Sequence, residues 1–388
     1  MKISKFKAGV FQSKNNGKHY EYQCFLLNGI NHTFEVDNNN LQVQLEKSIH
    51  LLGELNAMTR LVPNIDLFIM SFISNEATLS SKIEGTQTEI EDSFKKEEDI
   101  KIEQRDDWLE VTLYINAVRS AINNLNKLPI CMRLIKQAHA TLLSSGRGKQ
   151  KLPGEFRTSQ NWIGGSSIQN ADFIPPHQDD VYELMPDLEN FLNNKIAIPE
   201  IIKIAIIHYQ FETIHPFCDG NGRIGRMLIP LHLVDKKLLS KPLLYMSAFF
   251  EANKDEYYQR LMQVRMKNDL LSWLLFFLKG VEITVKHSVG VLIETLELKE
   301  SLSEKIQEKT GSRSVNNIKM FEKLFETPFV RVEDVKTELS VSATTAKNIV
   351  DDLVRVDVLN ELTGNKRNRL FAFKPYLQLL KKPFSKYE

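Results

Sequence analysis

The stretch HPFCDGNGRIGR, residues 215–226, gives the first indication of the fold. Its glycines Gly220, Gly222 and Gly225 have the G-x-G-x-x-G spacing of a dinucleotide-binding turn, which requires a strand before it and a helix after it. Residues 199–214 instead predict a helix, because a proline opens them and the apolar run is long for a strand. No succession of alternating strands and helices follows, so we reject the dinucleotide-binding interpretation.

The same residues fit an anion-binding site better. Gly220, Asn221 and Gly222 can adopt backbone angles that aim successive N–H groups into one concavity. The helix that begins there points its positive end at the same place. Arg223 and Arg226 lie on one face of that helix, and their guanidinium groups suit phosphate oxygens. The pattern therefore predicts a polyphosphate site at the start of the helix.

Two further side chains in this stretch can supply chemistry. Asp219 offers a hard oxygen ligand of the kind that Mg²⁺ takes beside phosphates. His215 has an unperturbed pKa that suits a general base near neutral pH. Each residue alone has a simpler explanation, since a histidine before proline is commonly a structural hydrogen-bonding group and paired arginines are commonly solvated. Together they predict phosphoryl or nucleotidyl transfer.

The composition sets limits on the rest of the molecule. With 388 residues, the chain is long enough for two or three domains. A net charge of +1 gives no strong overall field toward nucleic acid or membrane. The 3 cysteines are too widely spaced for a disulfide framework or a metal-binding cysteine pair, so a reducing cytoplasm is expected. The longest apolar runs fall far short of the roughly 20 residues of a membrane span, and we expect a soluble protein without membrane contact.

The chain is expected to be mainly helical, with a small β element at its start. Residues 10–36 alternate polar and apolar side chains around turn signals such as Asn28-Gly29. From about residue 41 the apolar spacing becomes helical. Residues 146–176 form a long loop rich in Gly, Ser and Asn, in which the side chains around Gly164-Gly165 favour a short hairpin.

A separate C-terminal unit is predicted after a probable linker near residues 309–317. Three helices, the turn TGNKRN and a strand give the order of a winged helix-turn-helix. The turn would form a basic wing, but the recognition helix carries Asp351 and Asp352, which disfavour DNA. Contact with DNA and contact with protein both stay open. The expected domains are residues 1–125, 126–300 and 313–388.

The stretch HPFCDGNGRIGR resembles the signature of the Fic/DOC family: histidine, proline and phenylalanine, then an acidic residue, GNG and two arginines. The resemblance covers roughly residues 40–290. Residues 157–176 look like the family's substrate-positioning flap, and residues 243–261 look like its downstream nucleotide-pocket segment. It implies a mainly α fold with a Fic-type helical core, a short β-hairpin flap, the small N-terminal β element and the C-terminal winged helix.

The resemblance also implies transfer of AMP from ATP to a hydroxyl of a protein target or of the chain itself. His215 would be the base and Asp219 the ligand of Mg²⁺. The residues implied for ATP binding are Gly220, Asn221, Gly222, Arg223, Ile224, Gly225, Arg226, Tyr257 and Tyr258. For the two tyrosines, ordinary helix packing is an equally good explanation. The part of the flap implied to bind the target is Trp162, Ile163, Gly164 and Gly165, which could add a strand to the target segment.

A second motif, SSKIEG, predicts regulation. Ser80, Glu84 and Gly85 resemble the family's inhibitory-helix pattern, in which Ser or Thr is followed after three residues by Glu-Gly. On a helix Ser80 and Glu84 lie one above the other. A carboxylate presented to Arg226 would compete with the γ-phosphate of ATP, so the resemblance implies autoinhibition in cis. The simpler interpretation is a solvated glutamate near a glycine helix cap.

Two functions from different classes remain in competition. The first is an autoinhibited protein adenylyltransferase that acts on an unidentified protein substrate, on itself, or on both. The second is a DNA-binding transcriptional regulator whose Fic-like part senses nucleotide. Within the enzymes, transfer of another phosphate-bearing group or removal of AMP stays open, as does a homodimer. The complete set of acid, base and arginine side chains favours the enzyme, because a pure sensor would not need the base.

Overall fold

The structure is a computed structural model that describes residues 1–15, 17–18, 21–62, 64–382 and 384. Most of these residues are helical, which confirms the predicted class. The α-helices are α1 (Asn39–Leu61), α2 (Asp66–Ile83), α3 (Arg105–Asn124), α4 (Met132–Leu142), α5 (Val181–Asn193), α6 (Glu200–Ile214), α7 (Asn221–Asp235), α8 (Ser247–Ala252), α9 (Lys254–Lys267), α10 (Leu270–Thr310), α11 (Ser314–Lys323), α12 (Val332–Leu339), α13 (Ala343–Arg355) and α14 (Lys374–Leu380). The strands are β1 (Gly9–Lys14), β2 (Tyr22–Leu27), β3 (Phe329–Val330), β4 (Asn360–Glu361) and β5 (Phe371–Ala372).

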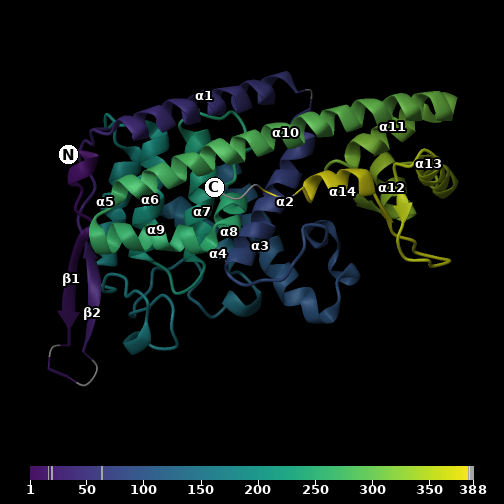
Figure 1. Ribbon diagram of the computed structural model, residues 1–388. Helices are drawn as coiled ribbons and strands as arrows, with labels where there is room; N and C mark the ends of the chain where they lie inside the picture. Colours follow the sequence, from purple (N-terminus) through teal and green to yellow (C-terminus); the bar gives the residue numbers. More distant parts are fainter. Residues whose placement is uncertain (16, 19–20, 63, 383, 385–388) are drawn as a thin grey trace.

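The small N-terminal β element is an antiparallel pair of β1 and β2, in which Gly9 pairs with Leu27 and Lys14 with Tyr22. It lies at one end of the molecule (Figure 1). The turn signal at Asn28-Gly29 directly follows β2 and does not join the two strands.

The centre of the molecule is α6, a helix that is buried on all sides. Every residue from Ile201 to Ile214 is buried, and most of them are apolar, as expected for a helix in the interior. The indole N–H of Trp273 on α10 donates to the carbonyl of Ala205 on α6 at 2.9 Å. This hydrogen bond fixes α10 against α6. The helix α1 runs alongside the first half of α10 (Figure 1). Because α6 is packed on all sides, its C-terminal end is held in place. His215 follows directly after that end.

The C-terminal part is joined to the rest by helix. The 41 residues of α10 extend from the helical core to this part, and a short 3₁₀ turn leads into α11 (Figure 1). The expected linker near residues 309–317 is thus the end of one helix and the start of the next. Buried side chains on both sides belong to one hydrophobic cluster, with Phe325 edge-on to Phe68 of α2 at 5.3 Å. The C-terminal part therefore packs on the helix that carries Ser80.

Strands β3, β5 and β4 form a small antiparallel sheet in that order, next to α11, α12 and α13. Across the whole described chain, none of the helices combines the length and the apolar character that crossing a membrane would require.

Candidate active site

The site lies where α6 ends and α7 begins. His215 caps α6 in the left-handed conformation, with φ 50° and ψ 59°, and its N–H still donates to the carbonyl of Phe211 at 2.9 Å. Gly220, with φ 74°, precedes the first residue of α7. The four residues between them reverse the chain, so the C-terminal end of one helix and the N-terminal end of the next share one place.

The loop is fixed by Asn221 and by His139 of α4. The Asn221 carboxamide accepts from the N–H of Phe217 and donates to its carbonyl, both at 2.8 Å. The His139 ring stacks on the Phe217 ring, with centroids 3.7 Å apart. Its Nε2 lies 2.9 Å from the carbonyl oxygen of Asp219, and its Nδ1 accepts from the N–H of Gly154 at 2.9 Å. The Asn221 side chain therefore shapes the loop, and only its backbone is free to face an anion.

Arg223 lies between two carboxylates. Its guanidinium donates to Glu110 of α3 at 3.2 Å and to Asp219 at 3.4 Å. Glu110 also accepts from Arg147 at 2.7 Å. Arg223 is buried, whereas the side chain of Asp219 is 42% exposed. An anion that binds beside α7 would thus contact a buried guanidinium whose present partners are carboxylates, which an anion could replace.

Asp219 is compatible with a bound Mg²⁺. Magnesium in phosphate-transfer sites commonly takes one or two protein carboxylates and completes its shell with water and substrate phosphates. Asp219 supplies one such carboxylate at the helix start where phosphates would lie. Nowhere in the described residues do three or more His, Cys, Asp or Glu side chains gather into a site that could hold a metal ion by themselves. The residues fit a cation that depends on the nucleotide for most of its ligands.

Arg226 is buried and is held by the inhibitory-motif residues of α2. Its Nε donates to Ser80 Oγ at 2.8 Å, and its Nη2 donates to the Ser80 carbonyl at 2.9 Å and to Glu84 Oε1 at 2.6 Å. Burial works to raise the pKa of the Glu84 carboxyl, but the Arg226 guanidinium outweighs it and holds that pKa below its ordinary value. A Cβ placed on Gly222 would lie 2.3 Å from Glu84 Oε1. The carboxylate therefore lies against the first turn of α7, and a Cβ at residue 222 would require it to move.

The imidazole of His215 is neutral over a wide pH range. Burial is the largest cause, and the cations Arg265 and Arg157 add to it, so that the pKa of His215 is lowered to about 4. Its Nδ1 lies 3.4 Å from the carbonyl oxygen of Glu212. A neutral ring with one nitrogen directed at a backbone carbonyl can accept a proton on the other nitrogen.

The flap, residues 157–176, contains one antiparallel bridge where a short hairpin was predicted. Ile163 and Phe173 exchange hydrogen bonds of 2.9 and 3.1 Å, and no strand forms among the described residues on either side of them. Gly164 and Gly165 both have positive φ, and Trp162 is 41% exposed. Beyond Ile163 and Phe173 the next hydrogen-bonded pair of the ladder would contain Pro175, which has no N–H to donate, and this explains the single bridge.

The remaining residues predicted to bind ATP differ in their burial and in their contacts. Ile224 is buried in the core. Gly225 permits close packing of α6 and α7, because a Cβ there would lie 2.2 Å from Glu212 Oε1. Tyr257 is buried with its hydroxyl 2.9 Å from Nε2 of His208, whereas Tyr258 is 40% exposed. Of the two tyrosines, Tyr258 has a ring face that a ligand can reach.

Several functional candidates were missed by sequence reasoning. Arg157 and Asn161 donate to the carbonyl of His215, Arg265 contacts the end of α6, Glu110 holds Arg223, and His139 holds the loop. Arg157 and Asn161 lie inside the stretch that resembles the flap, so their proximity to the site was foreseeable. The other three lie on separate helices, and nothing in their local sequence distinguishes them from other buried or paired residues.

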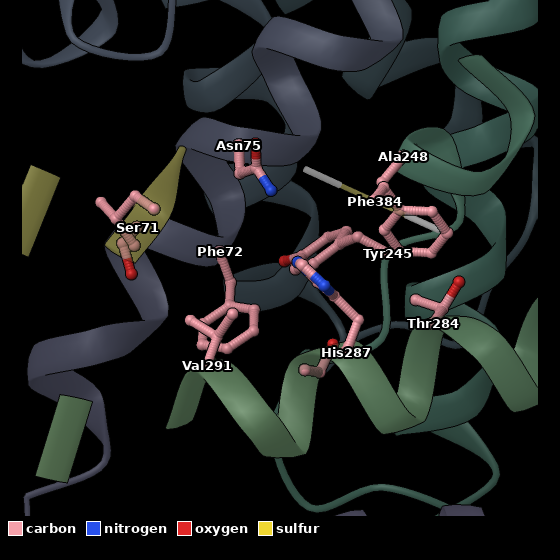
Figure 2. Close-up of a pocket in the computed structure, with 11 residues that line it drawn as sticks. Ser71, Phe72, Asn75, Tyr245, Ala248, Thr284, His287, Val291 and Phe384 are labelled. Carbon is pink, nitrogen blue, oxygen red and sulfur yellow. The ribbon is translucent and has the colours of Figure 1, made fainter. Parts of the chain in front are cut away.

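A small cavity of about 40 Å³ lies beside α2, with Ser71, Phe72 and Asn75 of that helix on one side and Thr284 and His287 of α10 on another (Figure 2). Its lining contains none of the predicted site residues. A volume of this size holds a few water molecules at most. We interpret it as a packing defect between α2 and α10, and the site at the α6–α7 junction as the chemical centre.

Comparison with known proteins gives two family matches. Residues 129–233 match the Fic/DOC family, and residues 43–123 match the Fic/DOC family N-terminal region. A probable protein adenylyltransferase of Aquifex aeolicus is 40% identical over 89 residues, which is 23% of this chain and 26% of that protein. The protein adenylyltransferase Fic of Drosophila willistoni is 34% identical over 118 residues, 30% of this chain and 21% of that protein. The chain thus spans about a quarter of the length of these relatives.

A similar fold occurs in the crystal structure of a Fic family protein from Desulfovibrio desulfuricans, with a TM-score of 0.56 and 18% sequence identity. The similarity covers 87% of this chain and 97% of that one. At this level of identity it is the fold that is shared.

Proposed function

We propose that this chain, which belongs to the Fic/DOC family, transfers AMP from ATP to a side-chain hydroxyl of a protein, either a separate target or the chain itself. The observation that carries the proposal is the convergence at one helix junction of a neutral imidazole, a carboxylate, free N-terminal amides of α7 and two arginines. The adenylyltransferase names of the relatives that match over the same segment support it.

In the proposed reaction each of these groups has one role. His215 accepts the proton of the attacking Ser, Thr or Tyr hydroxyl, and the hydroxyl oxygen forms a bond to the α-phosphorus of ATP. The bond from that phosphorus to the bridging oxygen breaks, and pyrophosphate leaves with the electron pair. The first amides of α7 and the arginines Arg223 and Arg226 stabilise the charge on the phosphates. Asp219 would hold Mg²⁺, which when bound would neutralise negative charge on the phosphates.

Glu84 is proposed to keep this site idle. Its carboxylate occupies the guanidinium of Arg226 at 2.6 Å and lies against Gly222, where the terminal phosphate would have to bind. Ser80 adds two contacts to the same guanidinium, so Nε and Nη2 of Arg226 are both held by the motif at the end of α2. ATP must then either displace the carboxylate or bind with its phosphates out of line for transfer.

The test uses ATP labelled at the α-phosphate and follows incorporation into the protein. We expect Glu84→Gly to raise self-labelling by about 10- to 100-fold, the range of a typical coupling free energy. We expect His215→Ala to lower it by about 100-fold or more in the same background, because a general base contributes at least that much. Intact-mass measurement should show the added mass of one or more AMP groups.

Glu89→Gly is the matched control, because it makes the same substitution at an exposed glutamate five residues along the chain. It should leave labelling at the level of the unmodified protein. No labelling in Glu84→Gly with ATP and Mg²⁺ would contradict the enzyme, whereas equal labelling with and without the substitution would contradict only the inhibitory role.

A second candidate function, contact with DNA, is favoured by one feature of the C-terminal part. The order α11, β3, α12, α13, β4, β5 is that of a winged helix. Asp352, which counts against DNA in the sequence, is buried and paired with Arg313 at 3.0 Å and with Arg355. The exposed start of α13 carries Lys347 and Asn348.

A gel shift with a 30-base-pair duplex tests this candidate. The exposed basic residues Lys366 and Arg367 between β4 and β5 would contact phosphate, so replacing both with alanine should weaken binding and reduce its salt dependence. If neither protein retards the duplex at low salt, the C-terminal part serves a protein contact instead.

A further inference from the structure

Arg157 is a completely buried arginine without a carboxylate partner. It is 0% exposed, and among the described residues no acidic side chain forms an ion pair with it. Its guanidinium donates only to backbone carbonyls: Nε to His215 at 2.9 Å, Nη1 to Ser159 at 3.2 Å, and Nη2 to Pro176 at 2.6 Å and to Ile214 at 3.4 Å. A charge buried in this way is expensive unless every donor is satisfied, so the arrangement calls for a reason.

The reason lies in the backbone of His215. A residue with a Cβ in the left-handed region costs about 1–2 kcal/mol, and here it also precedes a proline. The conformation persists because Arg157 Nε and the Asn161 carboxamide, at 3.3 Å, both hold its carbonyl oxygen. The N–H of Arg157 donates in addition to the carbonyl of Pro216 at 2.9 Å. The direction of the His215 side chain depends on this turn.

The same guanidinium joins the two ends of the flap. Ser159 lies near the start of the flap and Pro176 is its last residue, and both carbonyls accept from Arg157. Gln160 repeats the connection, because its carboxamide donates to the carbonyl of Pro175 at 3.1 Å. Movement of the flap is therefore transmitted to the carbonyl of His215 through Arg157, and Asn161 of the flap provides a second connection.

The end of α6 provides the compensation for the buried charge. The last carbonyls of a helix carry a partial negative charge, and two of Arg157's acceptors, Ile214 and His215, lie there. Burial lowers the pKa of Arg157 to about 10, which still leaves the group cationic at neutral pH. The planar guanidinium can bind four carbonyls at fixed angles, which a lysine ammonium cannot do.

We propose that Arg157 is the positioning residue of the reaction: it holds the left-handed turn that orients the His215 imidazole and couples that orientation to the closed ends of the flap. The inference rests on the proposed function, because it assigns Arg157 to the site where AMP transfer would occur. Arg157 touches neither the first turn of α7 nor Arg226, so its effect falls on the base and not on the nucleotide.

The experiment compares Arg157→Lys, Arg157→Met and Asn161→Ala, each combined with Glu84→Gly. Arg119→Met, which removes an exposed arginine of α3, is the matched control. Three quantities are measured: the rate of self-labelling at saturating ATP and Mg²⁺, the affinity for a non-hydrolysable ATP analogue, and the midpoint of thermal unfolding. Asn161→Ala and Arg157→Lys keep the comparison informative if Arg157→Met does not fold.

We expect the labelling rate to fall by about 10- to 100-fold in Arg157→Lys, and by less in Asn161→Ala, because a small misorientation of the base is costly. The affinity for the ATP analogue should stay within about twofold of the Glu84→Gly protein, the scatter expected of a distant, independent site. An unchanged labelling rate in Arg157→Lys would overturn the proposal. So would a parallel loss of rate, nucleotide affinity and thermal stability, which indicates a general structural role.

The pH profile separates positioning from packing. Three charged side chains act on the His215 imidazole: Arg265 from α9, Arg157 from the flap and Glu84 from the end of α2, while Glu212 of α6 contributes its backbone carbonyl. Removing the Arg157 cation removes one cause that lowers the pKa of His215, so the acid limb of the labelling rate should move to higher pH in Arg157→Met. An acid limb that does not move contradicts the proposal.

If the Glu84→Gly protein itself is not labelled, the proposed function fails and the rate comparison loses its basis. The surroundings of the His215 ring can still be followed, because the chemical shifts of its imidazole protons in NMR spectra require no turnover. Imidazole chemical shifts and a titration that are both unchanged in Arg157→Met would then overturn the inference independently of the enzyme assignment.

Discussion

Two pairs of buried arginines flank the same site and differ in what they bind. At the start of α7, Arg223 and Arg226 face the carboxylates of Glu110 and Glu84. At the end of α6, Arg157 faces only carbonyls, and Arg265 donates to the Thr213 hydroxyl and the Glu212 carbonyl, at 3.1 and 3.2 Å.

The difference follows from what can be exchanged. A carboxylate on a flexible side chain can leave an arginine and be replaced by a phosphate, because both offer oxygen pairs to the guanidinium fork. A backbone carbonyl inside a packed core cannot leave without unfolding its surroundings. Arg223 and Arg226 are therefore suited to bind and release a ligand. Arg157 and Arg265, which contact the end of α6, are suited to fix the backbone there.

The largest expected effect comes from Arg226 in the exchangeable pair. In the Glu84→Gly background, Arg226→Ala should lower kcat/KM for ATP by about 100- to 1,000-fold, as expected when one preorganised donor to a charged transition state is removed. Labelling rates as a function of ATP concentration give this value. A loss below fivefold would mean that Arg226 binds only Glu84 and Ser80, and that the two pairs do not differ as described.

A second substitution tests the packing that brings the two pairs together. Gly225→Ala places a methyl group 2.2 Å from Glu212 Oε1 and 3.2 Å from a ring carbon of Phe211. Overpacking of this kind should lower the free energy of unfolding by about 2 kcal/mol. Urea denaturation measures the change.

Gly53→Ala is the control for this prediction, because a Cβ on Gly53 of α1 meets no atom within 4 Å. Alanine at an exposed helical position should raise the free energy of unfolding by about 0.5–1 kcal/mol. The same substitution then acts in opposite directions at two helical sites. If both raise the stability, α6 and α7 are not in the close contact that brings the two arginine pairs together.

The first pair could be predicted from the sequence and the second could not. Arg223 and Arg226 belong to a short local pattern in which glycines, a helix start and charge spacing all point to an anion. The Fic-type helical fold was also predictable, because the motif is contiguous and long. Glu84 was found because its own motif places it on a helix end.

The second pair depends on tertiary contacts that leave no local pattern. Arg157 and Arg265 lie 108 residues apart in the sequence. Both reach the end of α6 only because the flap and α9 pack against it. The single bridge of the flap was likewise unpredictable in detail, since Trp162 and Ile163 are as compatible with a two-stranded hairpin. The ATP-binding role predicted for Gly225 had the right spacing, but the close helix contact there provides another reason for glycine.

The effect of Arg157 and Arg265 on the pKa of His215 should be measurable in the pH dependence of labelling. The imidazole must be neutral to accept a proton, and its pKa is lowered to about 4, so activity should persist as the pH falls and be lost only below about pH 5. In the Glu84→Gly protein the nearby carboxylate that raises this pKa is gone, which shifts the limb lower still. Labelling at pH 5.5 should remain within about twofold of that at pH 7.5, whereas an ordinary histidine would give about a tenfold loss.

Glu212 requires its own control in that experiment. Burial raises the pKa of its carboxyl to about 7, against the opposing effect of Arg226, so a step in the same pH range could arise from Glu212. Such a step should disappear in Glu212→Gln. An acid limb near pH 6.5 that survives this substitution would show that burial and the arginines at the end of α6 do not lower the pKa of His215.

The smallest expected effect concerns Glu110 and tests whether a phosphate can also replace the carboxylate that binds Arg223. Glu110 holds Arg223 at 3.2 Å without being part of any recognised motif, and it also binds the exposed Arg147 at 2.7 Å. If Glu110 competes with phosphate as Glu84 is proposed to do, Glu110→Gln should strengthen binding of an ATP analogue by about threefold, the effect of weakening one partly screened charge interaction. Calorimetry in the Glu84→Gly background measures this directly.

The direction of that change is decisive. A weaker affinity would mean that Glu110 orients Arg223 for the nucleotide, and that only one of the two α7 arginines exchanges its partner. Asp107→Asn is the matched control, because Asp107 also binds Arg147, at 2.6 Å, but does not contact Arg223. An equal effect of the two substitutions would assign the change to Arg147 and to the general field of the surface. A change confined to Glu110→Gln would assign it to Arg223, and would extend the exchangeable class from one arginine to both.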